Sequence, residues 1–107
     1  MVLALEGALR GEGFRVHRGL VASSDAFHAE ESNLGLWSSL GIIAVEMECA
    51  AIFSVARMRG LRTGAALLVI DNLATGEFMG AGAEERRRLE LRAARGALRA
   101  LAGLQVG

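Results

Sequence analysis

Three clusters of polar and acidic side chains are the residues of this sequence best suited to chemistry. They are Ser23–Asp25, Glu46–Glu48 and Asp71–Asn72. Each cluster directly follows a segment that predicts a β-strand, and two of these segments are apolar runs. Ligands of open α/β sheets collect outside the carboxyl ends of the strands, so we expect the three clusters to converge on one ligand site.

Each cluster also has a purely structural explanation. Glu46 and Glu48 could be acids at the start of a helix, where the helix dipole favours negative charge. Asp71–Asn72 could be an ordinary turn pair, and Ser23–Asp25 a cap or a turn. The sequence leaves these alternatives open, but the coincidence of three clusters at three strand ends favours a ligand site.

The cysteine and the two histidines do not form a second candidate site. Cys49 is interpreted as a small buried helix residue, because neither histidine is predicted near it to activate a thiolate. His17 falls inside a predicted strand and His28 in a predicted loop. With one cysteine and no paired ligand spacing, we expect no metal site.

Residues 42–72 predict a strand–helix–strand unit that positions two of the clusters. Ile42–Val45 is rich in β-branched residues and too short for a helix, and Gly64–Ile70 is typical of a parallel strand buried on both faces. Gly60 is placed to end the helix between them. We expect the two strands to be parallel and joined by a right-handed crossover. The expected buried face of the helix consists of Cys49, Ile52, Phe53 and Ala56.

The remaining elements alternate in the same way and indicate an α/β fold. A strand is expected at Phe14–Ala22, and loops at Ala29–Asn33 and Leu73–Gly82. The predicted helices are Val2–Arg10, Leu34–Leu40 and Ala83–Leu101.

Composition narrows the class of protein. The 107 residues allow one small domain, and 52% hydrophobic residues is high for that length, so we expect another chain to cover part of the apolar surface. Zero net charge argues against nucleic acid or an acidic membrane as a partner. A single cysteine suits the reducing cytoplasm, and no apolar run approaches the roughly 20 residues of a membrane span.

Two stretches resemble the nucleoside phosphorylase family, which includes purine nucleoside phosphorylases, uridine phosphorylases and methylthioadenosine nucleosidases. They are Ala44–Phe53 (AVEMECAAIF) and Val69–Asn72 (VIDN), and Ser23–Phe27 (SSDAF) is similar to the family's base-site strand end. The resemblance covers nearly all of residues 1–107 but only the second half of the family's domain. It implies a single domain with a partial three-layer α/β/α fold, whose mostly parallel sheet is flanked by helices.

The resemblance also implies roles in binding a nucleoside. Glu48 would accept hydrogen bonds from the ribose hydroxyls, and Met47 would pack against the sugar. Phe27 and Ser24 would contact the base, the ring of Phe27 against its flat heterocycle.

Catalytic roles follow from the same resemblance. Asp71 would protonate or hydrogen-bond the purine ring nitrogen as the base leaves, a general-acid role that also makes it a base-binding residue. Arg86 is similar to the arginine that swings toward this acid in the purine enzymes. Phosphate would be the nucleophile and co-substrate, and no cofactor or metal is implied.

Departures from the family pattern leave the base preference open. The family's glycine-rich phosphate loop and phosphate-binding arginines lie in its first half, and nothing in this sequence corresponds to them. Ala29–Asn33 lacks the uridine enzymes' Gln and Arg, which, like Asp71, favours a purine. In contrast, Ser23–Phe27 and Ala44–Cys49 are more similar to thermophile proteins grouped with uridine phosphorylases.

The sequence therefore predicts a nucleoside phosphorylase-like chain, a pentosyltransferase acting in nucleoside salvage on a purine nucleoside or uridine. We expect it to be incomplete alone and to form a homo-oligomer or to pair with a separately encoded amino-terminal half. One alternative is a non-catalytic remnant that still binds nucleosides. Another is a nucleosidase of the methylthioadenosine type, in which water replaces phosphate.

Overall fold

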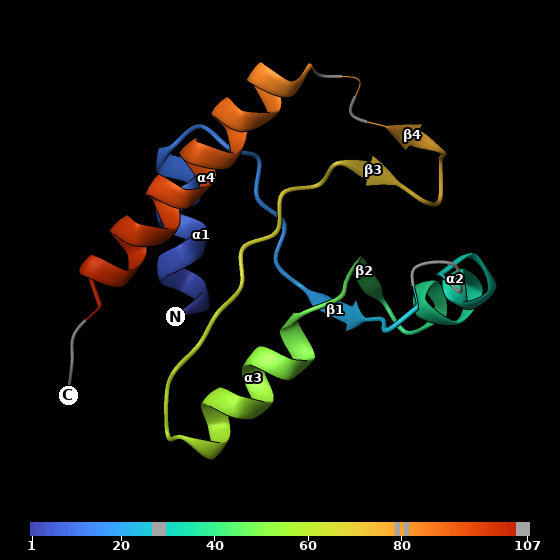
Figure 1. Cartoon of the computed structure of the whole chain (residues 1–107), viewed down its shortest axis with the longest axis horizontal. Coiled ribbons are helices and arrows are strands. Elements are labelled where there is room, and N and C mark those ends of the chain that lie inside the picture. The colour runs from blue at the N-terminus through green and yellow to red at the C-terminus, as the bar shows by residue number, and fades with distance from the viewer. Residues whose placement is uncertain (27–29, 79, 81, 105–107) are drawn as a thin grey trace. The chain divides into compact units, whose positions relative to one another are not determined.

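The computed structural model describes residues 1–26, 30–78, 80 and 82–104 (Figure 1). Helices and strands alternate from residue 2 to residue 72, so the predicted α/β class is confirmed. In chain order the elements are α1 (Val2–Gly11), β1 (Leu20–Ser23), α2 (Glu30–Ser39), β2 (Ile42–Glu46), α3 (Cys49–Met58), β3 (Asp71–Asn72), β4 (Glu77–Phe78) and α4 (Ala83–Ala102).

The chain divides into two compact units. The first unit comprises Met1–Arg18, Gly64–Asp71 and Phe78–Gly107, and the second comprises Gly19–Thr63 and Asn72–Glu77. The first therefore contains α1 and α4, and the second contains β1, α2, β2 and α3.

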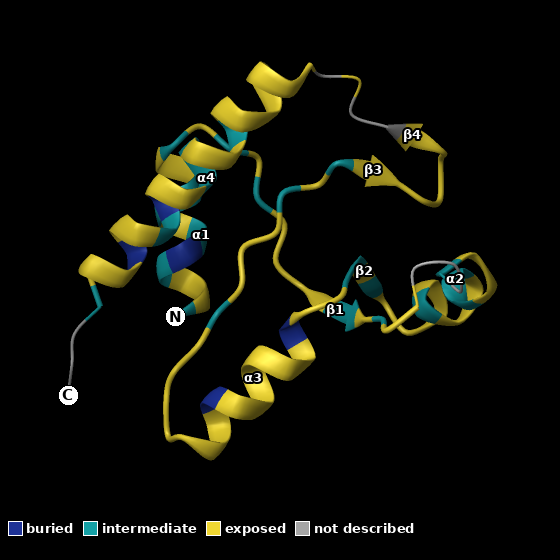
Figure 2. Ribbon diagram, viewed as in Figure 1, coloured by how far each residue is buried: buried dark blue, intermediate teal, exposed yellow. Residues whose placement is uncertain are grey.

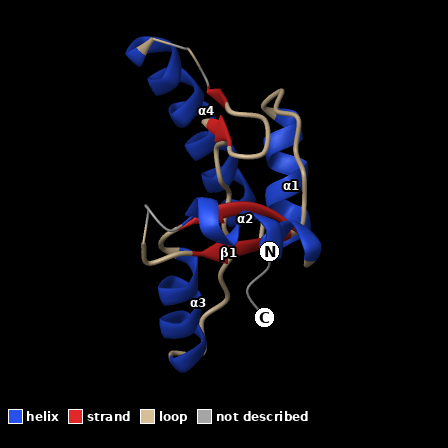
Figure 3. Ribbon diagram, turned by 90° about the vertical axis from the view of Figure 1, so that its right-hand side faces the viewer, coloured by secondary structure: helices blue, strands red, loops and turns tan. Residues whose placement is uncertain are grey.

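The second unit is built on a parallel pair of strands, β1 and β2 (Figure 3). Their register joins Val21 to Ala44, Ala22 to Val45 and Ser23 to Glu46, after an irregularity between Leu20 and Val21. Because parallel strands end at the same edge, this register brings the polar ends of both strands together. Ser23 and Glu46 thus lie side by side although they are 23 positions apart in the sequence.

Helix α3 follows β2 and ends at the predicted glycine. Gly60 has a φ of +68°, and its N–H donates to the carbonyl of Arg57 (3.2 Å). The N–H of Leu61 reaches back to the carbonyl of Ala56 (2.8 Å), which completes a Schellman motif. The predicted apolar face is only partly buried, since Cys49 and Ala56 are covered but Ile52 and Phe53 stay 54% and 39% exposed (Figure 2).

In the first unit, α1 packs against α4. Gly96 allows close approach, because a Cβ there would lie 2.9 Å from Cδ2 of Leu9. Glu12 pairs with Arg99 (Oε1–Nη1 3.0 Å) and with Arg95 (Oε2–Nη1 3.8 Å). The packing buries Leu5, Gly96 and Ala100 (Figure 2).

Several predicted elements differ from the structure. Residues 64–70 form no strand, so the expected crossover from Ile42–Val45 is wrong and β2 pairs with β1 instead. An apolar run becomes a strand only if a neighbouring strand takes up its N–H and C=O groups, and no described segment does so for residues 64–70. The predicted loop Leu73–Gly82 contains β4, which pairs with β3 in a short hairpin. Helix α2 begins at Glu30, within the predicted polar loop, and β1 covers only the end of Phe14–Ala22.

Candidate functional site

The candidate site begins where β1 and β2 end. The hydroxyl of Ser23 donates a hydrogen bond to Oε1 of Glu46, and the Ser24 N–H donates to the Glu46 carbonyl at 2.8 Å. A side-chain bond and a backbone bond therefore join the two strand ends. The pair lies immediately before the first turn of α3.

The same two side chains cap α3. Oε2 of Glu46 accepts from the N–H groups of Glu48 and Cys49, both at 2.6 Å. The Ser23 hydroxyl oxygen accepts from the N–H of Ala50 at 2.9 Å. The first N–H groups of a helix have no partner within the helix, and the N-cap residue Glu48 supplies no side-chain cap here. Residues from the two strands take over that function.

The hydrogen bonds set the protonation of Glu46. Burial by itself would raise the pKa of this carboxyl, but the hydrogen bonds from Ser23 and from the backbone of Cys49 and Glu48 lower the pKa below its ordinary value. Glu46 is therefore a carboxylate at neutral pH. Its negative charge is held at the positive end of the α3 dipole.

Cys49, next to Glu46 at the start of α3, keeps its proton. Burial, a hydrogen bond to Glu46 and the charges of Glu46 and Glu48 raise the pKa of its thiol to about 11. Only the thiolate is a good nucleophile, so this thiol is inert at neutral pH. The interpretation of Cys49 as a buried helix residue is confirmed.

Met47 and Glu48 project from the turn between β2 and α3 and are exposed to solvent. Their backbone is held between Glu46 and the helix, and the Met47 N–H donates to Oε2 of Glu48 at 3.2 Å. The Glu48 carboxylate thus retains acceptor capacity for a ligand. This exposed turn is the part of the candidate site that the structure describes most fully.

The predicted base-site residues are described only in part. Ser24 forms a local turn in which its hydroxyl and the backbone of Ala26 interact at 3.3 Å, and Asp25 is exposed. Phe27 and His28 lie outside the described residues.

Asp71 and Arg86 belong to the first unit, whereas Met47 and Glu48 belong to the second. Asp71 is an exposed residue of β3. Arg86 pairs with Glu90 one turn along α4 (Nε–Oε1 3.0 Å), and among the described residues no hydrogen bond or ion pair joins it to Asp71. Asn72 accepts from the N–H of Ala74 at 3.0 Å, which is the turn role that the sequence left open for this pair.

The role of Ser23 and Glu46 in holding this turn was not predicted from the sequence. The sequence marked Ser23–Asp25 as a cap or turn and Glu46 as an acid at the helix start. Only the register of β1 and β2 assigns both side chains to the cap of the same helix. No short sequence motif predicts that these two side chains cap the same helix.

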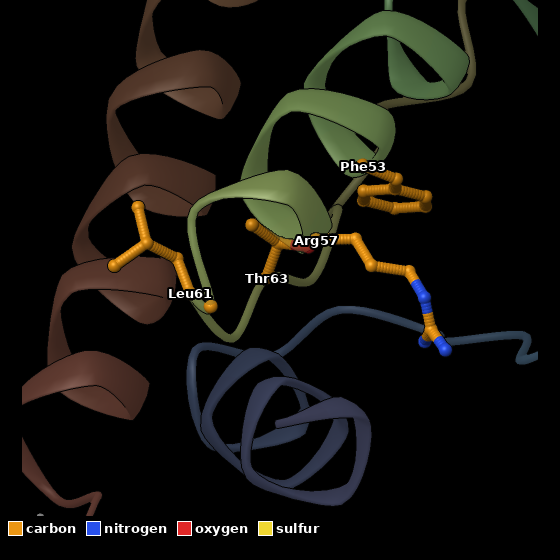
Figure 4. Close-up of a pocket in the computed structure, with 5 residues that line it drawn as sticks. Phe53, Arg57, Leu61 and Thr63 are labelled. Atoms are coloured by element: carbon orange, nitrogen blue, oxygen red, sulfur yellow. The ribbon is translucent and has the colours of Figure 1, made fainter.

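A shallow hollow of about 540 Å³ lies at the other end of α3 (Figure 4). It is lined by Phe53, Arg57, Gly60, Leu61 and Thr63. In Figure 4 the Arg57 side chain extends away from the helix end. The hollow is distinct from the turn at Met47 and Glu48, which precedes the first residue of α3.

The described part of the chain holds neither a metal-binding cluster nor a membrane-spanning helix. No group of three or more described His, Cys, Asp and Glu residues is placed to hold a metal ion. None of the described helices has the length and apolar character needed to cross a membrane.

The chain is similar in sequence to known nucleoside phosphorylases. The family model described as "Phosphorylase superfamily" matches residues 1–103. A guanosine phosphorylase of Halorubrum lacusprofundi is 37% identical over 76% of this chain and 34% of its own length. A DeoD-type purine nucleoside phosphorylase of Geobacillus kaustophilus is 38% identical over 71% of this chain and 31% of its own length.

A relative that is named for a different nucleoside matches a similar share of the chain. The uridine phosphorylase of Thermococcus kodakarensis is 32% identical over 79% of this chain and 36% of its own length. The alignments thus span about a third of the length of these relatives. No solved structure matches the chain significantly.

Proposed function

Because the chain belongs to the phosphorylase superfamily, we propose that it supplies the nucleoside-binding part of a nucleoside phosphorylase active site. The observation that carries this proposal is the exposed turn of Met47 and Glu48 at the carboxyl end of the parallel pair β1–β2. Ligands of α/β sheets bind at that edge. The names of the relatives, which include guanosine, purine and uridine phosphorylases, support the same substrate class.

In this proposal the turn binds the sugar. The Glu48 carboxylate accepts hydrogen bonds from the ribose hydroxyls, and the thioether side chain of Met47 packs against the ring. Cleavage of the N-glycosidic bond passes through an oxocarbenium-like sugar, so a fixed carboxylate nearby stabilises the developing positive charge. Glu46 does not bind the sugar in this scheme, because both of its carboxylate oxygens are already hydrogen-bonded within the protein.

The remaining site residues act on the departure of the base. A phosphate oxygen forms a bond to the anomeric carbon while the bond from that carbon to the base nitrogen breaks. Asp71 gives a proton or hydrogen bond to the leaving purine, and Arg86 is its partner in that step. Ser24 and Phe27 contact the base. The substrate is a purine nucleoside or uridine, and we place the reaction in nucleoside salvage in the cytoplasm.

A second polypeptide completes the site in this proposal. It is a second copy of the chain or a separately encoded amino-terminal half, and it supplies the phosphate-binding groups. One observation supports a partner: apolar side chains of α3 are left exposed, with Val55 at 57% and Met58 at 84%.

The test is base release from inosine, guanosine, adenosine, uridine and methylthioadenosine by the purified chain, with and without phosphate. Phosphate-dependent release that is abolished by Glu48→Ala and retained by Glu31→Ala supports the proposal. Glu31 is the matched control, since it is an exposed glutamate of α2 in the same unit.

The other outcomes identify the alternatives. Release without phosphate assigns the chain to the water-using nucleosidases. No release, combined with nucleoside binding that Glu48→Ala removes, identifies a binding chain that needs its partner for catalysis. No release and no binding overturns the proposal.

A further inference from the structure

We propose that Ser23 is a positioning residue, which holds Glu46 against the start of α3 and thereby fixes the turn that carries Met47 and Glu48. This role deepens the proposed function and depends on it, because the turn matters for activity only if these residues bind the ribose. Neither Ser23 nor Glu46 contacts the substrate in this scheme.

The Ser23 hydroxyl both donates and accepts a hydrogen bond. A serine hydroxyl can donate one hydrogen bond and accept two. Ser23 donates to Oε1 of Glu46 and accepts from the N–H of Ala50 at 2.9 Å. One side chain at the end of β1 is thus joined to the last residue of β2 and to the first turn of α3.

Both carboxylate oxygens of Glu46 accept hydrogen bonds from the protein. One carboxylate oxygen accepts from Ser23, and the other accepts from the N–H groups of Glu48 and Cys49 at 2.6 Å each. Hydrogen bonds to an ionised group are shorter and stronger than neutral ones. The carboxylate therefore acts as an anchor for the backbone on both sides of the turn.

The side chains of the turn itself stay available. Glu46 begins the turn and the N–H of Glu48 is held by Glu46, so the backbone of Met47 is fixed between two anchored points. The side chains of Met47 and Glu48 are nevertheless exposed. The two glutamates of the Glu46–Glu48 segment therefore have different roles. Glu46 holds the backbone of the turn, and Glu48 presents an exposed carboxylate.

Removal of the Ser23 hydroxyl should loosen the turn without unfolding α3. Ser23→Ala takes the acceptor from the Ala50 N–H and leaves Oε1 of Glu46 free to rotate toward water. Ser23→Thr keeps a hydroxyl at the same position. Ser39→Ala is the matched control, because the Ser39 hydroxyl donates to the Leu36 carbonyl within α2 (2.7 Å), away from the turn.

The experiment measures amide–water exchange by NMR on the ¹⁵N-labelled chain without ligand. In Ser23→Ala we expect exchange at Glu48, Cys49 and Ala50 to accelerate about tenfold, the change that accompanies a tenfold shift in an opening equilibrium. Ser23→Thr and Ser39→Ala should retain the wild-type rates. Unchanged rates in Ser23→Ala overturn the proposal.

A second variant keeps the proposal testable if Ser23→Ala does not fold. Glu46→Gln preserves the shape of the side chain but replaces one acceptor oxygen by a donor. We expect faster exchange at Glu48 and Cys49, with Ala50 still protected by Ser23. If all three amides in Glu46→Gln exchange at the wild-type rates, the anchoring role of the carboxylate is contradicted.

The link to function is tested by titration with inosine and with uridine. Ser23→Ala should weaken nucleoside affinity about tenfold, Ser23→Thr should restore it, and Ser39→Ala should not change it. Faster exchange with unchanged affinity overturns the positioning role but leaves the proposed function intact. If the wild-type chain binds no nucleoside, the proposed function fails, while the exchange rates still support or overturn the anchoring of the turn by Ser23.

Discussion

At the scale of single residues, Glu46 and Glu48 are chemically identical and two positions apart, yet their environments differ. Glu46 is partly covered and accepts hydrogen bonds from Ser23, Glu48 and Cys49, whereas Glu48 is exposed. The difference arises because Glu46 ends a strand beside Ser23, and Glu48 is the N-cap of the next helix. This position leaves Glu48 available to bind a ligand.

Cys49 gives a prediction for alkaline pH. Its thiol pKa is raised from an ordinary 9.0 to about 11, so the folded state binds this proton more tightly than the unfolded state. The stabilisation is complete below pH 9.0 and is lost as pH rises through about 11. We expect the free energy of unfolding, measured by urea denaturation, to fall across this interval.

Few other side chains of this sequence interfere with the measurement at alkaline pH. It contains no Lys and no Tyr, so Cys49 is the side chain that titrates between pH 9 and 11. Cys49→Ala should therefore remove the alkaline decline. Ultraviolet absorbance of the thiolate reports the same pKa directly, and Glu46→Gln should lower that pKa by removing a neighbouring negative charge. A decline that persists in Cys49→Ala would refute the assignment.

Glu46 gives the complementary prediction at acid pH. Because its pKa is lowered in the folded state, its contribution to stability is present above the unfolded pKa and is lost as pH falls through the folded value. The difference in unfolding free energy between wild type and Glu46→Gln should therefore shrink on acidification. Paired urea denaturation curves at several pH values measure it. A difference that is independent of pH would contradict this role.

At the scale of elements, α3 is defined by the interactions at its two ends. Ser23 and Glu46 bind the N–H groups at its start, and a Schellman motif at Gly60 satisfies the carbonyls at its end. The start depends on a neighbouring strand, whereas the end depends on residues within the segment. Local signals therefore predict the end of this helix better than the beginning.

The end of α3 predicts opposite effects for two glycine substitutions. Gly60 has a positive φ of 68°, where an L-residue costs roughly 1–2 kcal/mol, so Gly60→Ala should destabilise the chain by about 1 kcal/mol after the entropy gain in the unfolded state. Gly35 lies within α2, and a Cβ added there would meet no other atom within 4 Å, so Gly35→Ala should stabilise by about 0.5–1 kcal/mol. Urea denaturation of both variants checks the sign, and effects of the same sign would contradict the role of backbone conformation at Gly60.

At the scale of the whole molecule, exposed apolar side chains are the main feature. Within α3 alone, Ile52, Phe53, Val55 and Met58 are all exposed. Several exposed apolar side chains on one helix are typical of interaction sites or lead to aggregation. It supports the proposal that a further polypeptide completes the protein.

This surface predicts self-association of the isolated chain at micromolar concentration. Met58→Glu should shift sedimentation velocity profiles toward the monomer, because it places a charge where the side chain is 84% exposed. Ser38→Glu is the control, since it adds the same charge at an exposed position of α2. A stable wild-type monomer under these conditions would contradict the homo-oligomer, and a complementary half would then be the partner to supply.

The sequence by itself determined the features that depend on neighbouring residues. The helix at Ala83–Leu101, the strand beginning at Ile42 and the end of α3 at Gly60 were predicted nearly as they occur. The family followed from short motifs such as AVEMEC and VIDN and is confirmed. Hydrophobic periodicity, glycine conformation and motif chemistry are local properties, so the sequence displays them directly.

Only the tertiary structure decided which segments pair. It joined β1 to β2, left residues 64–70 without a strand partner among the described segments, and brought Ser23 to Glu46 across 23 residues. The apolar run at residues 64–70 suited a buried strand, but strand formation requires a second segment in register, and a one-residue slip would turn every side chain to the other face. Pairing and register are non-local, so the anchor of the candidate site could be recognised only once the strands were placed.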